Sequence, residues 1–342
     1  MKKVLVTGGL GYIGSHTVVS LVENGYHPII VDNLSNTHPN VKKGISEIVG
    51  KDVDYYNDEL RDRRAIRRIF DEHEIWGVIH FAASKYVGES VTNPIKYYTN
   101  NIDSLCSLVS IMCDYDVKNI VFSSSCAVYG DSEEQPVRED MFRYNPATSP
   151  YGHTKQICET MIEEFTRAYG MKGFTLRYFN PAGAHPSGLI GELPGRKELN
   201  LFPIMANAVL SGEKDLVVFG GDYATPDGTC LRDYIHVCDL ADAHVLALNK
   251  LESQKDGFSE ILNIGTGKGT SVLECINEFA EANLVAIEYR IGGRRKGDVE
   301  KVWASTEKSK QVLGWEPKRS LEDICKSAFT WHLKCITPKE VN

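Results

Sequence analysis

The chain contains 342 residues, of which 42% are hydrophobic and 25% charged, a composition typical of a folded globular protein with room for two hydrophobic cores. The formal net charge of −8 argues against a nucleic acid or a membrane surface as the main partner. No apolar run reaches the roughly 18 residues of a membrane-spanning helix, and the nine cysteines and ten histidines form no C-x-x-C pair and no metal-binding motif, so we expect a cytoplasmic protein without a metal site.

The first segment of the chain predicts a strand, a glycine-rich turn and a helix. Residues 4–7 form a short β-branched run typical of a buried parallel strand, and an apolar helical pattern begins at His16 and ends before Gly25. Three glycines at a spacing of three residues separate them: Gly8, Gly11 and Gly14. Glycines in this context let backbone amides approach a pyrophosphate at a helix N-terminus, which predicts a dinucleotide site.

The second predicted strand, residues 29–31, ends in Asp32. A carboxylate at the end of this strand can accept hydrogen bonds from the ribose hydroxyls of an adenosine. A 2′-phosphate would meet a negative charge there, so the sequence favours NAD over NADP. The alternative interpretation is a turn-initiating pair, Asp32 and Asn33.

The alternation of strands and helices continues through the first half of the chain. We expect strands over residues 53–56, 77–81 and 119–123, and helices over residues 61–73 and 95–115. Repeated βα units predict a parallel sheet covered on both faces, with ligands at the carboxyl ends of the strands. Ala82, Ala83 and Lys85 follow one such strand end, and Ser123–Ser125 lie at another.

A helix that begins at Pro150 carries the strongest candidate for proton transfer. Tyr151 and Lys155 are four residues apart and therefore share one helix face. A phenol has a pKa near ~10, and a neighbouring ammonium group lowers that pKa by favouring the phenolate. The pair is thus a candidate acid and base, although the motif alone is more often a surface tyrosine above a solvated lysine.

The alternation stops after Asn180, and residues 183–200 are rich in glycine, proline and polar residues. We therefore predict two domains: a Rossmann-type, doubly wound parallel sheet over residues 1–180, and a smaller C-terminal α/β lobe over residues 181–342. The chain is expected to cross back to the first domain around residues 230–245. The expected elements of the lobe are helices over 201–210, 237–250 and 321–334 and a strand over 216–219.

A glycine-rich run at residues 265–271 superficially resembles a phosphate-binding loop. It fails that pattern because Gly269 directly follows Lys268. We interpret the run as a strand-to-helix turn.

Together the glycine turn, Asp32, Ser125 and the Tyr151–Lys155 pair resemble the extended short-chain dehydrogenase/reductase superfamily. Longer strings resemble one family within it, the UDP-glucose (UDP-galactose) 4-epimerases. These strings are residues 7–16, 31–34, 87–90, 123–125, 128–130, 177–188, 232–236 and 295–298. The resemblance extends over essentially the whole chain.

The resemblance implies NAD as the cofactor. The cofactor-binding residues it implies are Gly8, Gly11, Tyr12, Ile13, Gly14, Asp32, Asn33, Leu34, Ser35, Asn36, Thr37, Asp58, Glu59, Leu60, Phe81, Ala82, Ala83, Ser84, Lys85, Asn100, Ser125, Tyr151, Lys155, Tyr178 and Phe179. The family usually has Gly-Asp-Ile/Leu-Arg after the third strand, whereas this chain has Asp58-Glu59-Leu60-Arg61. Either Asp58 or Glu59 could therefore face the adenine.

The resemblance also implies a UDP-galactose/UDP-glucose site in the C-terminal lobe. The implied substrate-binding residues are Lys85, Ser125, Cys126, Ala127, Tyr151, Phe179, Asn180, Leu199, Asn200, Leu201, Val218, Phe219, Arg232, Arg295, Asp298 and Val302. The position of Val302 is a tyrosine in members restricted to UDP-hexoses and is small in members that also accept N-acetylated sugars. We therefore hypothesise that UDP-GalNAc and UDP-GlcNAc are also substrates.

The family further implies a homodimer formed through helices like 95–115 and 151–169.

The implied reaction is epimerisation at C4 by transient oxidation, with Tyr151 as base and acid, Lys155 beside it and Ser125 on the sugar hydroxyl. A nucleotide-sugar 4,6-dehydratase would carry Asp-Glu where this chain has Cys126 and Ala127. A true dehydrogenase or reductase would exchange NAD with solvent. A non-enzymatic NAD-sensing module of the same fold should lack the catalytic pair.

Overall fold

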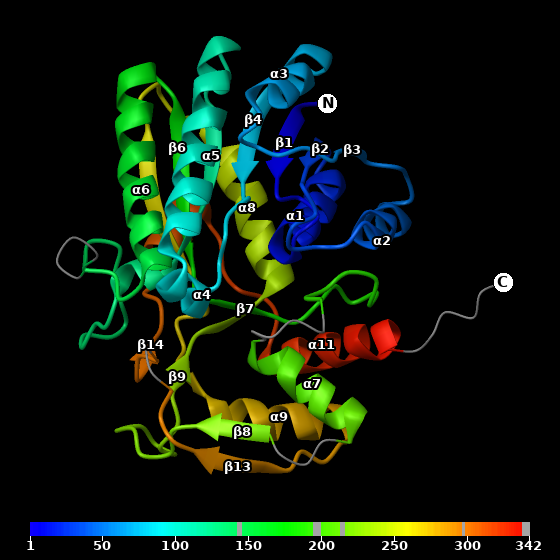
Figure 1. Cartoon of the computed structure of the whole chain (residues 1–342), viewed down its shortest axis with the longest axis vertical. Helices are drawn as coiled ribbons and strands as arrows, with labels where there is room; N and C mark the ends of the chain where they lie inside the picture. The colour runs from blue at the N-terminus through cyan, green and yellow to red at the C-terminus, as the bar shows by residue number, and fades with distance from the viewer. Residues whose placement is uncertain (142–145, 194–199, 213–215, 296–297, 337–342) are drawn as a thin grey trace.

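The computed structural model describes residues 1–141, 146–193, 200–212, 216–295 and 298–336. Its main feature is a seven-stranded sheet in the order β11-β6-β5-β4-β1-β2-β3, in which all neighbouring strands pair in parallel (Figure 1). The strands are β1 (Lys3–Thr7), β2 (His27–Val31), β3 (Asp54–Tyr56), β4 (Ile75–His80), β5 (Asn119–Ser125), β6 (Lys172–Tyr178) and β11 (Ser259–Ile264). The predicted Rossmann-type fold is confirmed.

Helices cover both faces of this sheet. One face is covered by α1 (Tyr12–Glu23), α2 (Asn40–Val49) and α8 (Val237–Leu251), and the other by α3 (Arg63–Glu72), α5 (Pro94–Asp114) and α6 (Pro150–Tyr169). Each face of the sheet carries its own hydrophobic core. In β1, Val4 and Val6 pack into the core under α1, α2 and α8, whereas Leu5 between them packs into the core under α3, α5 and α6. A strand buried on both sides needs no polar alternation, which explains the continuous apolar runs in the sequence.

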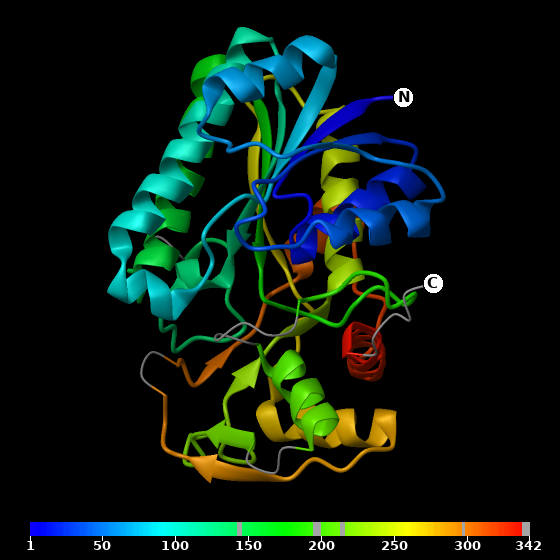
Figure 2. The same ribbon diagram turned by 45° about the vertical axis from the view of Figure 1, so that its right-hand side comes forward.

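The smaller lobe lies beyond the carboxyl ends of the strands, below the sheet in Figures 1 and 2. It contains α7 (Leu201–Ser211), α9 (Val272–Asn283), α11 (Leu321–Ile336) and a parallel pair of strands, β8 (Leu216–Phe219) and β13 (Tyr289–Gly292). Its core is separate from those of the sheet and includes Phe202, Met205, Phe279 and Ile324.

Short strands connect the two parts. β7 (Asn180–Ala182) pairs with β10 (Tyr234–His236), and β9 (Leu231–Arg232) pairs with both β12 (Thr270–Ser271) and β14 (Lys301–Val302). The chain returns to the large sheet through α8 and β11, so the return extends farther along the sequence than the predicted crossing at 230–245.

The glycine-rich run at residues 265–271 joins β11 to α9 as predicted, although its last two residues form the short strand β12. The buried Asp233 carboxylate holds this turn by accepting hydrogen bonds from the amides of Thr266 (2.7 Å) and Gly267 (3.0 Å).

The remaining helical elements are η1 (Cys126–Tyr129), α4 (Val87–Thr92) and α10 (Glu307–Leu313). Within the described residues, no helix is long and apolar enough to cross a membrane, and no group of three or more candidate ligands could hold a metal ion.

Candidate active site

The turn between β1 and α1 is packed so closely that it requires glycine. Gly8 has φ +69°, and a Cβ there would lie 2.9 Å from the Ala82 amide nitrogen. A Cβ on Gly14 would lie 2.3 Å from the Gly8 carbonyl oxygen. The first turn of α1 therefore sits directly against the ends of β1 and β4. This backbone cradle at a helix N-terminus fits a dinucleotide pyrophosphate.

Asp32 braces the loops on either side of this turn. Its Oδ2 accepts a hydrogen bond from the Leu10 amide (3.1 Å), and its Oδ1 accepts one from the Leu34 amide (2.9 Å). Burial raises the pKa of the Asp32 carboxyl, while these amides oppose that shift. Asp32 lies at the end of β2 and is 9% exposed. Its contact with a ribose is consistent with this position and stays a prediction.

The two acidic residues after β3 have different partners. The Asn33 side-chain amide donates to Glu59 Oε2 at 2.9 Å, whereas Asp58 pairs with Arg68 at 2.8 Å on α3. Glu59 therefore lies against the loop that follows β2, where an adenosine would be bound. The geometry favours Glu59 over Asp58 as the residue that faces the adenine.

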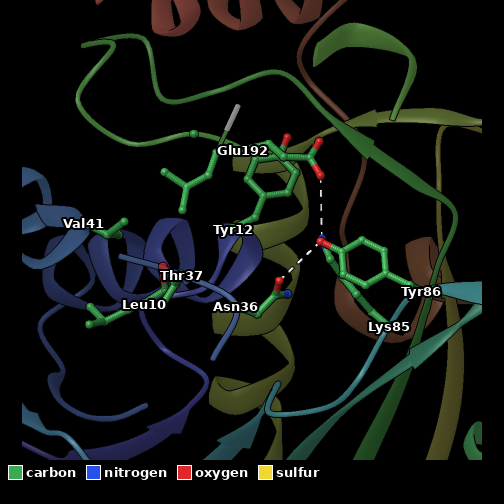
Figure 3. Close-up of a pocket in the computed structure, with 10 residues that line it drawn as sticks. Leu10, Tyr12, Asn36, Thr37, Val41, Lys85, Tyr86 and Glu192 are labelled. Atoms are coloured by element: carbon green, nitrogen blue, oxygen red, sulfur yellow. Dashed lines mark hydrogen bonds and ion pairs between the residues drawn. The ribbon is translucent and has the colours of Figure 1, made fainter. Parts of the chain in front are cut away.

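A cavity opens beside the glycine turn (Figure 3). It is lined by Leu10, Tyr12, Asn36, Thr37, Val41, Lys85, Tyr86, Gly191, Glu192 and Leu193. The cavity brings together predicted cofactor residues from α1, from the loop after β2 and from the loop after β4. Segments from both sides of residue 180 meet here, because the Tyr12 hydroxyl donates to the Gly183 carbonyl at 2.6 Å.

Glu192, which the sequence reasoning missed, lies between the cofactor and substrate residues. Its carboxylate is 3.6 Å from Lys85 Nζ (Figure 3). It also accepts a hydrogen bond from the Asn200 side chain at 2.8 Å. Lys85 was predicted to bind both ligands, and Asn200 the substrate. A single acidic residue in a loop carries no periodicity that could have revealed this bridge.

The three predicted catalytic residues converge at the carboxyl end of β5. Ser125 ends β5, and its hydroxyl accepts a hydrogen bond from the Ala127 amide at 3.2 Å. A Cβ on Gly152 would lie 2.6 Å from the Ala127 carbonyl oxygen, so the first turn of α6 packs directly on η1. One turn farther along α6, Lys155 Nζ donates to the Ser123 carbonyl at 2.6 Å. Tyr151, Lys155 and Ser125 therefore form one cluster.

Burial dominates the proton affinities of this cluster. It raises the pKa of Tyr151 to about 12, and the hydrogen bond with Ser125 opposes the shift. It lowers the pKa of Lys155 to about 8, against the attraction of Cys158 and Glu159. The sequence predicted a Tyr151 pKa lowered by Lys155. In the protein alone that expectation is wrong, because desolvation of the phenolate outweighs the favourable groups.

The predicted substrate residues come from several short elements of the connecting region and the lobe. Val302 packs in one buried cluster with Phe179 and Tyr129, and it lies opposite Arg232 in the register of β14 and β9. Cys126, next to Ser125, is partly buried against the same cluster. The structure therefore connects Val302 to the segment that carries Ser125.

The other substrate candidates divide into exposed and buried residues. Arg295 forms a two-pronged ion pair with Asp298 (3.1 and 2.9 Å), and its guanidinium is 5.5 Å from the ring centre of Phe219. Val218 and Leu201 instead pack into the core of the lobe, Asn180 begins β7, and Leu199 lies outside the described residues.

Two further cofactor candidates, Asn100 and Tyr178, lie on α5 and at the end of β6. Tyr178 is 4% exposed, and its hydroxyl is hydrogen-bonded to His244 of α8, which suits a packing role. Asn100 donates to its neighbour Asn101 at 3.2 Å.

Asn101 is a further residue that the sequence reasoning missed. Its side chain accepts from the Ser84 amide (2.8 Å) and donates to the Thr154 hydroxyl (3.0 Å), which joins the loop after β4 to α6, the helix that carries Tyr151 and Lys155. Asn101 is 3% exposed. A polar residue on the apolar face of α5, one turn after Tyr97 and one before Leu105, was the available signal.

Comparisons with known proteins agree with this geometry. The profile of the NAD dependent epimerase/dehydratase family matches residues 4–265. The chain belongs to this family. A UDP-glucose 4-epimerase from Bacillus subtilis is 46% identical over 329 residues, which cover 96% of each chain.

Two solved structures are also similar. One is a UDP-glucose 4-epimerase from Stenotrophomonas maltophila with bound NAD and formylated UDP-arabinopyranose, with a TM-score of 0.93, 41% identity and coverage of 98% of this chain and 99% of that one. The other, from Bifidobacterium longum in complex with NAD+ and UDP, has a TM-score of 0.90, 42% identity and coverage of 97% and 98%. The predictions of an enzyme of this family and of NAD as its cofactor are confirmed.

Proposed function

We propose that the protein interconverts UDP-galactose and UDP-glucose by transient oxidation at C4 of the hexose. The observation that supports this most is the convergence of Ser125, Tyr151 and Lys155 at the sheet edge that also carries the glycine cradle. In this arrangement a sugar hydroxyl can meet a proton acceptor and a nicotinamide at the same time.

In the proposed mechanism, Tyr151 as phenolate takes the proton of the sugar O4, and Ser125 holds that hydroxyl as a hydrogen-bonding partner. When bound, NAD supplies the hydride acceptor and donor for C4. Tyr151 then returns the proton once hydride has been delivered to the opposite face of the 4-keto sugar. No net oxidation results, and both protons and electrons balance over the cycle.

The Tyr151 pKa of about 12 must fall for this base to act near neutral pH. Two positive charges can stabilise the phenolate: the Lys155 ammonium group one turn away, and the cationic nicotinamide ring. Because Lys155 has a pKa of about 8, it carries its proton at neutral pH. The depressed value also means that Lys155 loses this proton in mildly alkaline solution.

The return of hydride to the other face requires the hexose to turn while the nucleotide stays bound. We propose that Arg232 and Arg295 hold the diphosphate, that Asp298 binds the uridine ribose, and that Phe219 packs on the base. The aromatic ring of Phe219 is 44% exposed, which supports a contact with a ligand. Anchoring at the nucleotide leaves the sugar free to rotate.

We also propose that the N-acetylated substrates UDP-GalNAc and UDP-GlcNAc are accepted. The small side chain of Val302, beside Phe179 near the catalytic strand, supports a pocket with room for an acetamido group. Turnover of UDP-galactose without any turnover of UDP-GalNAc would contradict this part of the proposal.

Two properties of the native protein are proposed with the activity. The first is a homodimer formed through α5 and α6, for which Val91 (61% exposed) and Ile95 (74% exposed) near the start of α5 provide an apolar surface. The second is a cytoplasmic location, supported by the exposed thiols Cys106 and Cys113. Analytical ultracentrifugation tests the first, and fractionation of native cells tests the second.

The experiment that tests the proposed function is incubation of the purified protein with UDP-galactose without added NAD, followed by identification of the products. UDP-glucose is the expected product. Tyr151→Phe should lose turnover by at least about a hundredfold while retaining NAD, because only the acid/base group is removed. A Phe variant with full activity, or a 4-keto-6-deoxy product from the unmodified protein, would contradict the proposal.

A further inference from the structure

A fully buried ion pair lies next to the cluster formed by Ser125, Tyr151 and Lys155. The side chains of Arg177 on β6 and Glu159 on α6 are 0% and 1% exposed. Arg177 Nη2 donates to Glu159 Oε2 at 2.7 Å, and its Nε donates to Oε1 at 2.9 Å, so the two groups meet fork to fork. Neither residue belongs to the predicted catalytic or binding set.

The pair extends into the elements that carry the catalytic residues. The hydroxyl of Ser124, which lies between Ser123 and Ser125, donates to Glu159. On the other side, Arg177 Nη1 donates to the Tyr129 hydroxyl at 2.8 Å and to the Glu139 carbonyl at 2.9 Å. The ion pair thus ties β5, η1 and the following loop to the catalytic helix.

Stability alone does not account for such a pair. Desolvating two charges usually costs as much as their attraction returns, and apolar residues of similar volume often serve the fold equally well. Glu159 is also one turn beyond Lys155 on α6, and its charge raises the Lys155 pKa against the effect of burial. The location therefore points to a role in proton transfer.

We propose that the Glu159–Arg177 pair is a positioning device for the proton-transfer segment. The hydrogen bond from Ser124 to Glu159 fixes Ser123–Ser125 against α6. The Arg177 guanidinium partly compensates the negative charge of Glu159 beside Lys155. The inference rests on the proposed function, because it concerns the base and its partners in that reaction. The other titratable groups around the pair and Lys155 are Cys158 on α6, His80 on β4, and Tyr129 and Glu139 across Arg177.

Two single variants should shift the pH profile in opposite directions. Glu159→Gln removes the negative charge, so Lys155 should lose its proton at lower pH, and the alkaline limb of the kcat/KM profile should shift to lower pH. Arg177→Met leaves the carboxylate uncompensated, so the same limb should shift to higher pH. Lower kcat without these opposite shifts would overturn the proposal, because a purely structural role alters the amount of active protein and not the pKa of Lys155.

A double variant, Glu159→Leu with Arg177→Met, covers the case in which a single variant does not fold. It removes both charges at similar volume and should unfold at a urea concentration close to that of the wild type. We expect kcat to fall at least tenfold, because Ser124 loses its acceptor. Wild-type kcat in the folded double variant would overturn the proposal.

The exposed pair Glu163–Arg167 on the same helix is the matched control. Its charges are 3.6 Å apart, and their side chains are 47% and 71% exposed. Glu163→Gln should leave the pH profile unchanged. A profile that moves as in Glu159→Gln would overturn the specific role of the buried pair.

Two further measurements separate this inference from the proposed function. Turnover by the wild type is measured first, and its absence would refute the proposed function without bearing on the pair. Urea unfolding of the wild type, both singles and the double then gives the coupling between positions 159 and 177 without any turnover. Strong coupling is expected, and additive effects would overturn the inference that the two residues act as one unit.

Discussion

The two parts of the molecule position their candidate site residues in different ways. Around the large sheet, Asp32 and Lys155 are 9% and 3% exposed and are fixed by hydrogen bonds at strand ends. In the smaller lobe, the side chain of Arg295 is 60% exposed, and Phe219 is 44% exposed. We infer that the chemistry is built on a rigid edge, whereas the proposed nucleotide contacts lie where side chains can adapt. The proposed mechanism, in which the sugar turns between two hydride transfers, needs this division.

The largest effect should follow the loss of Lys155, a buried charge at the rigid edge. Lys155→Met should lower kcat at least about a hundredfold, because the phenolate loses its stabilising cation. The same variant should be more stable at neutral pH by about 1–3 kcal/mol, since it no longer buries an ammonium group, although it loses the hydrogen bond to Ser123. Urea unfolding and steady-state kinetics measure both effects.

The sign of this stability effect depends on pH. The Lys155 pKa is about 8 in the folded protein against 10.5 for a free side chain, so the unfolded chain binds more protons between these values. The stability of the wild type relative to Lys155→Met should therefore rise as the pH increases from about 8 to 10.5. A variant that is less stable at neutral pH would contradict the burial cost assigned to this lysine.

The effect of adding one methyl group should differ between the closely packed sheet edge and the open lobe. Gly152→Ala places a Cβ 2.6 Å from the Ala127 carbonyl, so α6 must move away from η1. We expect roughly a tenfold to hundredfold loss of kcat, because Tyr151 and Ser125 separate. Gly293→Ala is the matched control, since no heavy atom lies within 4 Å of its Cβ. Equal losses in both variants would contradict the contrast between the two regions.

Buried histidines should make the sheet half sensitive to acid. Burial lowers the pKa of both His16 and His80 to about 3, so these rings stay neutral in the folded protein. The unfolded chain binds the extra protons between about pH 6.5 and 3, and each ring can remove about 1.4 kcal/mol per pH unit. The free energy of unfolding, measured in urea, should fall steeply below pH 6.5. His80→Gln should make this decline shallower.

The same contrast explains what the sequence could predict. The glycine turn, Asp32 and the Tyr151–Lys155 pair follow local rules of spacing and strand ends, so their places on the turn after β1, at the end of β2 and on α6 were predicted correctly, whereas their binding and catalytic roles stay predictions. The return of the chain as β11 was missed, because no local pattern shows that residues 259–264 pair with β6. The bridges made by Asn101 and Glu192 were also missed, since each joins segments far apart in the sequence.

The smallest effect is expected in the adaptable lobe, at Arg295. Its ion pair with Asp298 is exposed, and such pairs contribute about 0–1 kcal/mol to stability. Arg295→Lys keeps the positive charge but loses the fork that can grip a diphosphate, so KM for UDP-galactose should rise several-fold. Because the residue lies away from the proton-transfer cluster, kcat and the urea midpoint should change little. A large fall in kcat with unchanged KM would indicate that the lobe takes part in the chemistry itself, and the separation of a rigid catalytic edge from an adaptable anchor would then be wrong.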